Sequence, residues 1–85
     1  MAKNTTIQVK IYAPFRTYFN GTALSLSATN KTGPFDVLPG HKNFMTLLVP
    51  STITVRVPEK GDFQMKASRG VMHVKANQTT VFLDV

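Results

Sequence analysis

Apolar and polar residues alternate with a period of two along most of this 85-residue chain, and this pattern limits its fold more than any other feature. Ile7, Val9 and Ile11, for example, are separated by Gln8 and Lys10. Further apolar sets with the same spacing are Leu24 and Leu26; Ile53, Val55 and Val57; Phe63, Met65 and Ala67; and Val81, Leu83 and Val85. A period of two is typical of strands with one buried and one wet face, so the pattern predicts strands rather than helices.

Turn-forming residues separate the alternating runs. They occur at Asn20-Gly21, Gly33-Pro34, Pro39-Gly40, Pro50-Ser51, residues 58–61 and Ala76-Asn77. Short strands divided by such turns indicate an all-β fold, a small β-sandwich of about ten short, mostly antiparallel strands. Segment 43–49 fits either a helical turn or a strand, because its apolar run has no clear period. The length allows one domain, residues 1–85.

Groups that could perform chemistry are sparse. The chain has no cysteine, which excludes disulfides and cysteine-bound zinc. His41 and His73 have no second ligand at metal-binding spacing, and the close acids Glu59 and Asp62 lie in a predicted hairpin turn. No glycine-rich phosphate loop or Gly-x-Ser-x-Gly elbow is present. The sequence therefore predicts a protein that is not an enzyme and that holds no cofactor or metal.

The chain is strongly basic. Its 10 Lys and Arg residues exceed its 4 Asp and Glu residues, which gives a net charge of +6. These cations are spread over predicted strands and turns, a distribution typical of a solvated face. Segment 12–19 nevertheless mixes aromatic residues with Arg16, as in barrels that stack bases on aromatic rings. A small basic β-protein that binds nucleic acid is therefore kept as the alternative function.

No secretion or membrane signal is visible. Lys3 is not followed by the apolar run of a signal peptide, and no segment approaches the ~20 apolar residues of a transmembrane helix. We therefore expect a soluble intracellular domain that would meet a membrane only through another protein or through surface charge.

Residues 33–41 read Gly-Pro-Phe-Asp-Val-Leu-Pro-Gly-His and lead into an apolar run at 44–48. This segment closely resembles the epsilon subunit of F-type ATP synthases, the equivalent of the mitochondrial delta subunit. Segment 7–14, followed by Phe19-Asn20-Gly21, is similar to the first hairpin of that family, and segment 68–83 is similar to its last. The Leu-Pro-Gly-His stretch is the specific part of the resemblance.

The resemblance implies a β-sandwich at the foot of the rotating central stalk. Its expected partners are the gamma subunit and the c-ring, on the cytoplasmic face of the inner or cell membrane, where the subunit couples the two without catalysing a reaction. The candidate interface residues are Phe35, Asp36, Leu38, Pro39, Gly40 and His41. Pro39 and Gly40 could instead only build a turn. For Phe35, Asp36 and His41, a role in partner contact and a purely structural role are equally open. A third possible function is that of a scaffold module that has kept this fold and lost the rotor role.

Three departures from the family pattern carry expectations. The helical pair that normally follows the sandwich is not in this sequence, so its inhibitory function is not expected. Pro34 stands where an acidic side chain often faces the c-ring, and Asp36 could substitute for that acid. Arg69 replaces the first of two glycines, and would be strained if its φ were positive.

Overall fold

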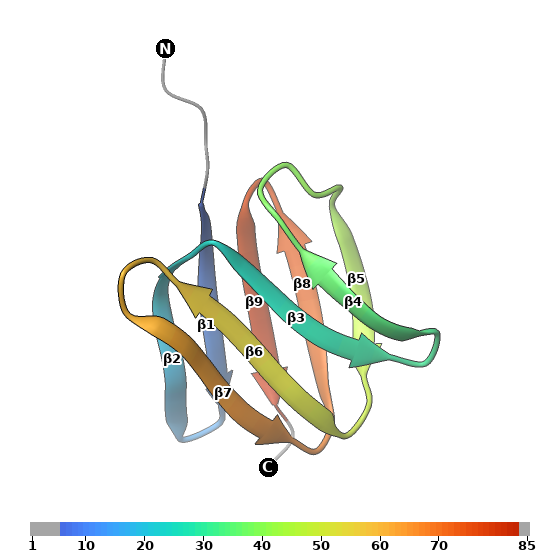
Figure 1. The fold of residues 1–85 in the computed structure, drawn as a ribbon. Helices are drawn as coiled ribbons and strands as arrows, with labels where there is room; N and C mark the ends of the chain where they lie inside the picture. Colours follow the sequence, from blue (N-terminus) through green and yellow to red (C-terminus); the bar gives the residue numbers. More distant parts are fainter. Residues whose placement is uncertain (1–5, 84–85) are drawn as a thin grey trace.

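The computed structural model describes residues 6–83 as nine strands and no helix (Figure 1). The strands are β1 (Ile7–Ala13), β2 (Arg16–Ala23), β3 (Ser25–Asn30), β4 (Gly33–Val37), β5 (Phe44–Leu48), β6 (Ser51–Val57), β7 (Gly61–Ala67), β8 (Gly70–Lys75) and β9 (Gln78–Leu83). The predicted all-β sandwich is confirmed, and the ambiguous segment 43–49 contains a strand. Within residues 6–83, no helix is long and apolar enough to cross a bilayer.

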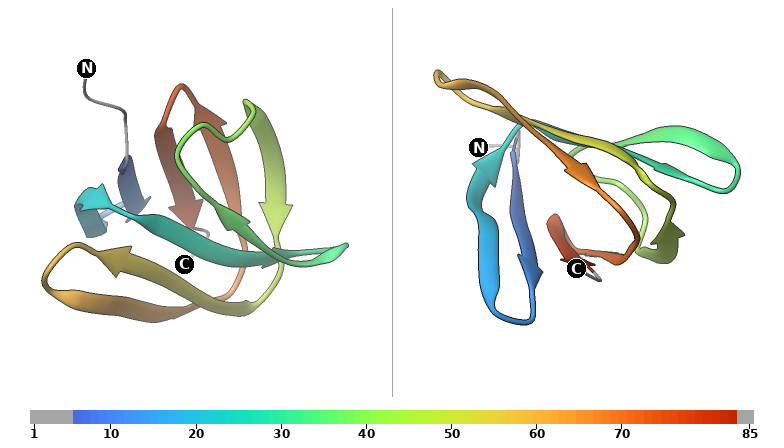
Figure 2. Two further views of the ribbon diagram at one scale, coloured as in Figure 1. Left: turned by 45° about the horizontal axis from the view of Figure 1, so that its top comes forward. Right: turned by 90° about the horizontal axis from the view of Figure 1, so that it is seen from below.

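Two sheets pack face to face. One has five strands in the order β2-β1-β9-β8-β5, and the other has four in the order β4-β3-β6-β7. Figure 2 shows them as separate layers whose strands cross at an angle. Neighbouring strands are antiparallel except β1 and β9, which run parallel in the middle of the five-stranded sheet. The mostly antiparallel pairing predicted from the sequence is therefore confirmed.

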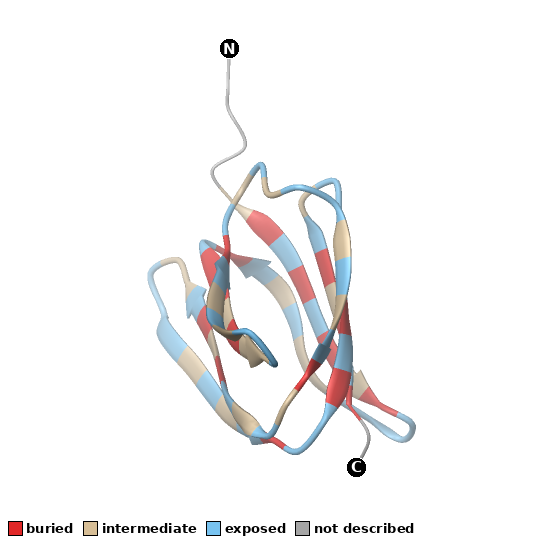
Figure 3. Cartoon of the chain, turned by 90° about the vertical axis from the view of Figure 1, so that its right-hand side faces the viewer, coloured by how far each residue is buried: buried red, intermediate tan, exposed pale blue. Residues whose placement is uncertain are grey.

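The core lies between the sheets and consists of the inward residues of the alternating runs (Figure 3). Its largest fully buried apolar side chains are Ile7, Val9, Ile11, Leu26, Val37, Ile53, Val55, Met72, Val74, Val81 and Leu83. Each such side chain contributes about 1.5–3 kcal/mol of transfer free energy when it leaves water. The period-two pattern thus stabilises the sandwich by placing one apolar layer on each side of a shared interior.

One part of the alternation was wrong. The sequence pattern placed Leu24 beside Leu26 on the inner face, but Leu24 is 43% exposed and Leu26 is fully buried. Leu24 lies between β2 and β3, where the chain passes from one sheet to the other, and its N–H donates to Arg56 O at 2.7 Å. Ser25 is buried instead, and its hydroxyl accepts a hydrogen bond from the Arg56 guanidinium at 3.2 Å.

The backbone strain expected at Arg69 if its φ were positive does not occur. The non-glycine residues with positive φ in the described chain are Glu59, Ala76 and Asn77, which lie in the β6–β7 and β8–β9 turns. Its neighbour Gly70 is constrained for another reason. A Cβ at Gly70 would lie 2.7 Å from the carbonyl oxygen of Phe82, so β8 and β9 approach each other there more closely than a side chain permits.

Thr79 supplies a first prediction. It is 1% exposed on the inner face of β9, and its hydroxyl is buried without a hydrogen-bond partner in the described part of the chain. A buried hydroxyl without a partner is destabilising, so Thr79→Val should raise the free energy of unfolding by about 1 kcal/mol. Chemical denaturation measures this change. Thr80→Val, on the outer face of the same strand, is the control and should change stability by less than about 0.5 kcal/mol.

Candidate interaction surfaces

The segment predicted to form the interface, residues 35–41, ends in a tight turn over residues 38–41. Pro39 occupies its second position, and Gly40 occupies its third with a φ of 83°. The His41 N–H donates to Leu38 O at 3.1 Å and closes the turn. This is the pattern of a type II turn, whose third residue requires a positive φ and therefore favours glycine. Pro39 and Gly40 thus have a structural role.

Hydrogen bonds attach this loop to the β8–β9 turn at the same end of the sandwich (Figure 1). The Gly40 N–H donates to Asn77 Oδ1 at 2.8 Å, and the Ala76 N–H donates to Asn43 Oδ1 at 3.0 Å. The carbonyl oxygen of Asn77 also accepts from the Gln8 N–H at 2.9 Å. Asn77 therefore ties the loop, the β8–β9 turn and the start of β1 into one unit.

The six predicted residues do not form a single surface. Phe35 points inward and meets the Phe44 ring at a centroid distance of 5.9 Å, while the His41 ring lies 4.8 Å from the same Phe44. Asp36 alternates to the outer face of the four-stranded sheet, where it accepts a hydrogen bond from Ser27 Oγ at 2.5 Å. Leu38 is 54% exposed on the loop. The structure therefore brings Phe35 and His41 together through Phe44 and separates Asp36 from them.

A second surface was not predicted from the sequence. On the outer face of the five-stranded sheet, apolar side chains occupy opposite positions on four adjacent strands: Tyr12 opposes Phe82, Phe82 opposes Val71, and Val71 opposes Leu47. We call these four residues the apolar strip. Leu47 is 70% exposed, and the Tyr12 and Phe82 rings meet edge to face at 5.1 Å. The strip is a continuous apolar band across the sheet.

Two sequence signals could have revealed the strip. Segment 44–48 is apolar at nearly every position, and Phe82 stands between the inward residues Val81 and Leu83. Apolar residues on both faces of a strand are typical of a strand covered on both sides. The pairing that aligns β1, β9, β8 and β5, however, is visible only in the fold.

The outer face of the four-stranded sheet is polar by contrast. Its outward side chains are Ser27, Pro34, Asp36, Thr52, Thr54, Arg56, Asp62, Gln64 and Lys66. Some of them hydrogen-bond to one another: Arg56 donates to Ser27 Oγ at 3.2 Å, and Gln64 donates to Thr54 Oγ1 at 3.4 Å. The outer face of the five-stranded sheet therefore carries an apolar strip, whereas the outer face of the four-stranded sheet is polar.

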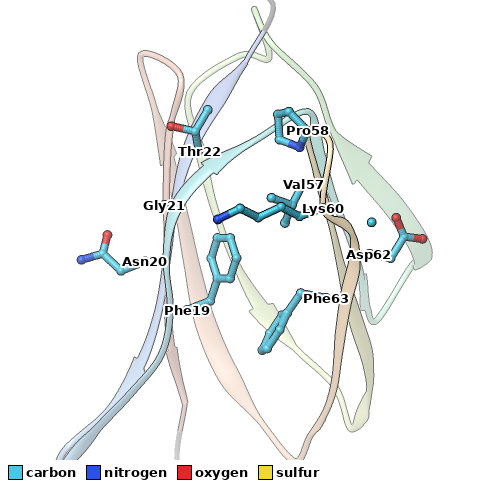
Figure 4. A pocket seen from close by; sticks show the side chains of 10 residues that line it. Phe19, Asn20, Gly21, Thr22, Val57, Pro58, Lys60, Asp62 and Phe63 are labelled. Carbon is cyan, nitrogen blue, oxygen red and sulfur yellow. The ribbon is translucent and has the colours of Figure 1, made fainter.

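A cleft of about 540 Å³ opens between the edge strands β2 and β7 (Figure 4). Phe19 and Phe63 point into it from opposite walls, with ring centroids 5.3 Å apart, and Lys60 extends across its mouth. Asp62 points away from the space. The cleft therefore presents no facing acid and base, and residues 6–83 hold no group of three metal-ligating side chains.

Asn77 supplies a second prediction. Its φ of 64° suits Asn or Gly, and its side chain holds Gly40. Asn77→Ala should lower stability by about 1–2 kcal/mol, because it adds backbone strain to the lost hydrogen bond. Asn77→Gly removes the same bond without that strain, so it separates the two effects. Amide hydrogen exchange at Gly40 should accelerate in both variants, and unchanged exchange would contradict the role given to Asn77.

Residues 6–85 match the family described as ATP synthase, Delta/Epsilon chain, beta-sandwich domain. The ATP synthase epsilon chains of Psychrobacter cryohalolentis and Nitratiruptor sp. are 32% and 28% identical to this chain over 79 residues. The matches cover 93% of this chain but only 57% and 61% of those two proteins. The chain therefore spans less than two thirds of the length of these curated relatives.

Solved structures share the fold. A chain in the Euglena gracilis mitochondrial ATP synthase, in a structure of OSCP, F1 and the c-ring, matches with a TM-score of 0.88 at 16% identity, over 98% of this chain and 53% of that chain. A chain in the central stalk and c-ring structure of the Tetrahymena thermophila mitochondrial ATP synthase matches with a TM-score of 0.75 at 18% identity, over 99% and 67%. Identities this low show a common architecture.

Proposed function

The chain belongs to the ATP synthase delta/epsilon family, through that family's β-sandwich domain, and from this premise we propose that it is a rotor subunit in the central stalk of an F-type ATP synthase. In this role it joins the gamma subunit to the membrane c-ring by protein–protein contacts. The observation that carries the proposal is the family match over residues 6–85, which includes every described strand. Nothing in the comparisons supports the nucleic-acid alternative.

The proposed role is non-catalytic and mechanical. A subunit that passes rotation from one partner to another must move as one body, and several features support this. A single core lies between the sheets, the turn at residues 76–77 is tight, and Asn77 ties the 38–41 turn to two other segments. We propose that residues 1–85 act as one domain, bound peripherally at the cytoplasmic face of the membrane through the c-ring.

The six residues predicted from the sequence take different parts in this proposal. Leu38 and Asp36 are the contacting side chains, because both are exposed. Phe35, Pro39, Gly40 and His41 shape and support the loop through the turn and the packing on Phe44. The loop lies at one end of the sandwich, where a partner could meet it without disturbing either sheet (Figure 1).

Co-purification tests the proposed function. The full chain carries an affinity tag, is expressed in its own host and is recovered from detergent-solubilised membranes. The gamma subunit and the c-ring should be recovered with it, and clean recovery of the chain without either would overturn the rotor role. Leu38→Ser should reduce the recovery of the partners, whereas Leu24→Ser, at an exposed leucine outside the loop, should leave it unchanged.

A further inference from the structure

The cleft between β2 and β7 is hollow because inward side chains are missing there. Gly21 occupies an inward position of β2, opposite the buried Val9. Gly61, at the start of β7, stands opposite Val57, which packs against the core. A Cβ at Gly21 would meet only the Phe19 ring, at 3.8 Å, and a Cβ at Gly61 would meet nothing within 4 Å. The space between the sheets is therefore unfilled at this edge, and it opens to solvent as the cleft of about 540 Å³ (Figure 4).

The walls of the cleft are apolar. Phe19 and Phe63 point into it, and their ring centroids lie 5.3 Å apart. Both rings and Val57 pack against the core but stay only half-buried, whereas Ile53 and Val55, inward from the middle of β6, are fully buried. An apolar group that entered the cleft would cover the exposed parts of these walls, and the removal of apolar surface from water favours binding.

A single cation lies at the mouth of the cleft. The Lys60 side chain extends across the opening, and no carboxylate of residues 6–83 forms an ion pair with it. Asp62, the acid in the lining, points away from the space. The net charge of +6 adds to the attraction for an anion. The molecule that complements both the apolar interior and the cationic entrance has an apolar tail and a negative head.

We propose that this cleft binds a small amphiphilic anion, a slender apolar chain that ends in one carboxylate, as in a medium-chain fatty acid. The tail lies against the Phe19 and Phe63 rings, in the space that the two glycines leave, and the carboxylate meets the Lys60 ammonium at the mouth. The volume of about 540 Å³ is within the roughly 300–1,000 Å³ that is typical of small-molecule sites. No lining residue belongs to the turn at residues 38–41, so this site is separate from the proposed rotor contact and goes beyond it.

An extended peptide is the other occupant that an open sheet edge invites, because β2 and β7 each have only one neighbouring strand. A peptide paired with either strand would continue that sheet at a spacing of about 4.8 Å, whereas the two sheets of a sandwich lie about 10 Å apart. Its backbone would extend one layer and leave the hollow between the layers to a single side chain. A slender tail enters the hollow lengthwise and brings its own charge to Lys60, so the geometry favours the small amphiphile.

The test is a titration of the full ¹⁵N-labelled chain with sodium decanoate, kept below its micelle-forming concentration and followed by amide chemical shifts. Saturable shifts are expected at residues 19–22 and 57–63, with little change at residues 38–41. Decyltrimethylammonium has the same tail with a cationic head and is the charge-reversed control. It should bind at least about tenfold more weakly, because Lys60 attracts the one head group and repels the other.

Two variants examine the tail site and the charge separately. Gly21→Leu fills the hollow from β2 and should abolish the saturable shifts. Lys60→Gln keeps the hollow, removes the charge from an exposed turn, and should weaken decanoate binding about tenfold. Lys66→Gln, on the outer face of β7, is its matched control and should change the affinity by less than about twofold. Thermal melting confirms that each variant is folded before it is titrated.

Loss of binding in Gly21→Leu together with weaker binding in Lys60→Gln would support the site. Decanoate that produces no saturable shift, that shifts the apolar strip instead, or that binds no better than the cationic amphiphile overturns it. Displacement of decanoate by an acidic peptide, with shifts along the whole of β2 or β7, overturns the assigned occupant. Co-purification with gamma and the c-ring is a separate measurement, so failure of the rotor role would leave this site standing.

Discussion

Leu26→Ala should lower the free energy of unfolding by about 2–5 kcal/mol, because it removes buried methyl groups and leaves a cavity between the sheets. Leu26 has no exposed surface, and it pairs with Val37 on one side and Val55 on the other, both fully buried. Neighbours held in two ladders have little freedom to close around a cavity. A domain of this size has a total stability of only a few kcal/mol more than this loss.

The control for this prediction is two residues away. Leu24→Ala removes the same atoms from a side chain that is 43% exposed, so its effect should stay below about 1 kcal/mol. Urea denaturation can be monitored by far-ultraviolet circular dichroism, because the chain has no tryptophan whose fluorescence would report unfolding. Equal losses for the two variants would contradict the assignment of Leu26 to the interior and Leu24 to the corner between sheets.

Gly70→Ala should be comparably damaging, although it adds only one methyl group. The new Cβ would meet Phe82 O at 2.7 Å and Leu83 Cδ2 at 2.9 Å. The first of these atoms is backbone and is held in the β8–β9 ladder, so relief requires moving a strand rather than rotating a side chain. We expect a loss of about 2–3 kcal/mol, at the upper end of the range for overpacked interiors.

Gly21→Ala provides the comparison. A Cβ at Gly21 would meet nothing closer than the Phe19 ring at 3.8 Å, which is an ordinary contact, and its φ is not positive. The variant should therefore match the wild type or exceed it by about 0.5 kcal/mol, because alanine restricts the unfolded chain. Thermal melts of both glycine variants check the pair, and a Gly70→Ala variant as stable as Gly21→Ala would show that β8 and β9 can separate at low cost.

The sequence predicted what depends on local pattern. The alternation at Ile53 and Val55 placed a strand with the correct inward face, and the Pro39-Gly40 pair gave the turn that the backbone adopts. Each of these signals is complete within a few residues, since a strand's two faces and a turn's torsion angles are local properties.

What the sequence did not predict depends on pairing between distant segments. The apolar strip exists only because Leu47, Val71 and Phe82 are in register, and no local pattern specifies that register. The inward prediction for Leu24 was wrong because the corner between sheets is set by its hydrogen bond to Arg56, over thirty residues away. The separation of Asp36 from Phe35 follows from alternation on β4, but the contact of Phe35 with Phe44 and His41 needed the fold.

The parallel pairing of β1 with β9 has a consequence for how the molecule is made. β9 lies between β1 and β8, so the β1–β2 hairpin and the β5–β8 pair have no shared neighbour in their sheet until β9 is present. During synthesis on the ribosome, the β1–β2 hairpin therefore waits for β9 to emerge, with the edges of β1 and β8 still unpaired. Pairing strands so distant in the sequence is slow and leaves those edges open to wrong partners, so we expect newly made chains to be most prone to aggregation before β9 is inserted.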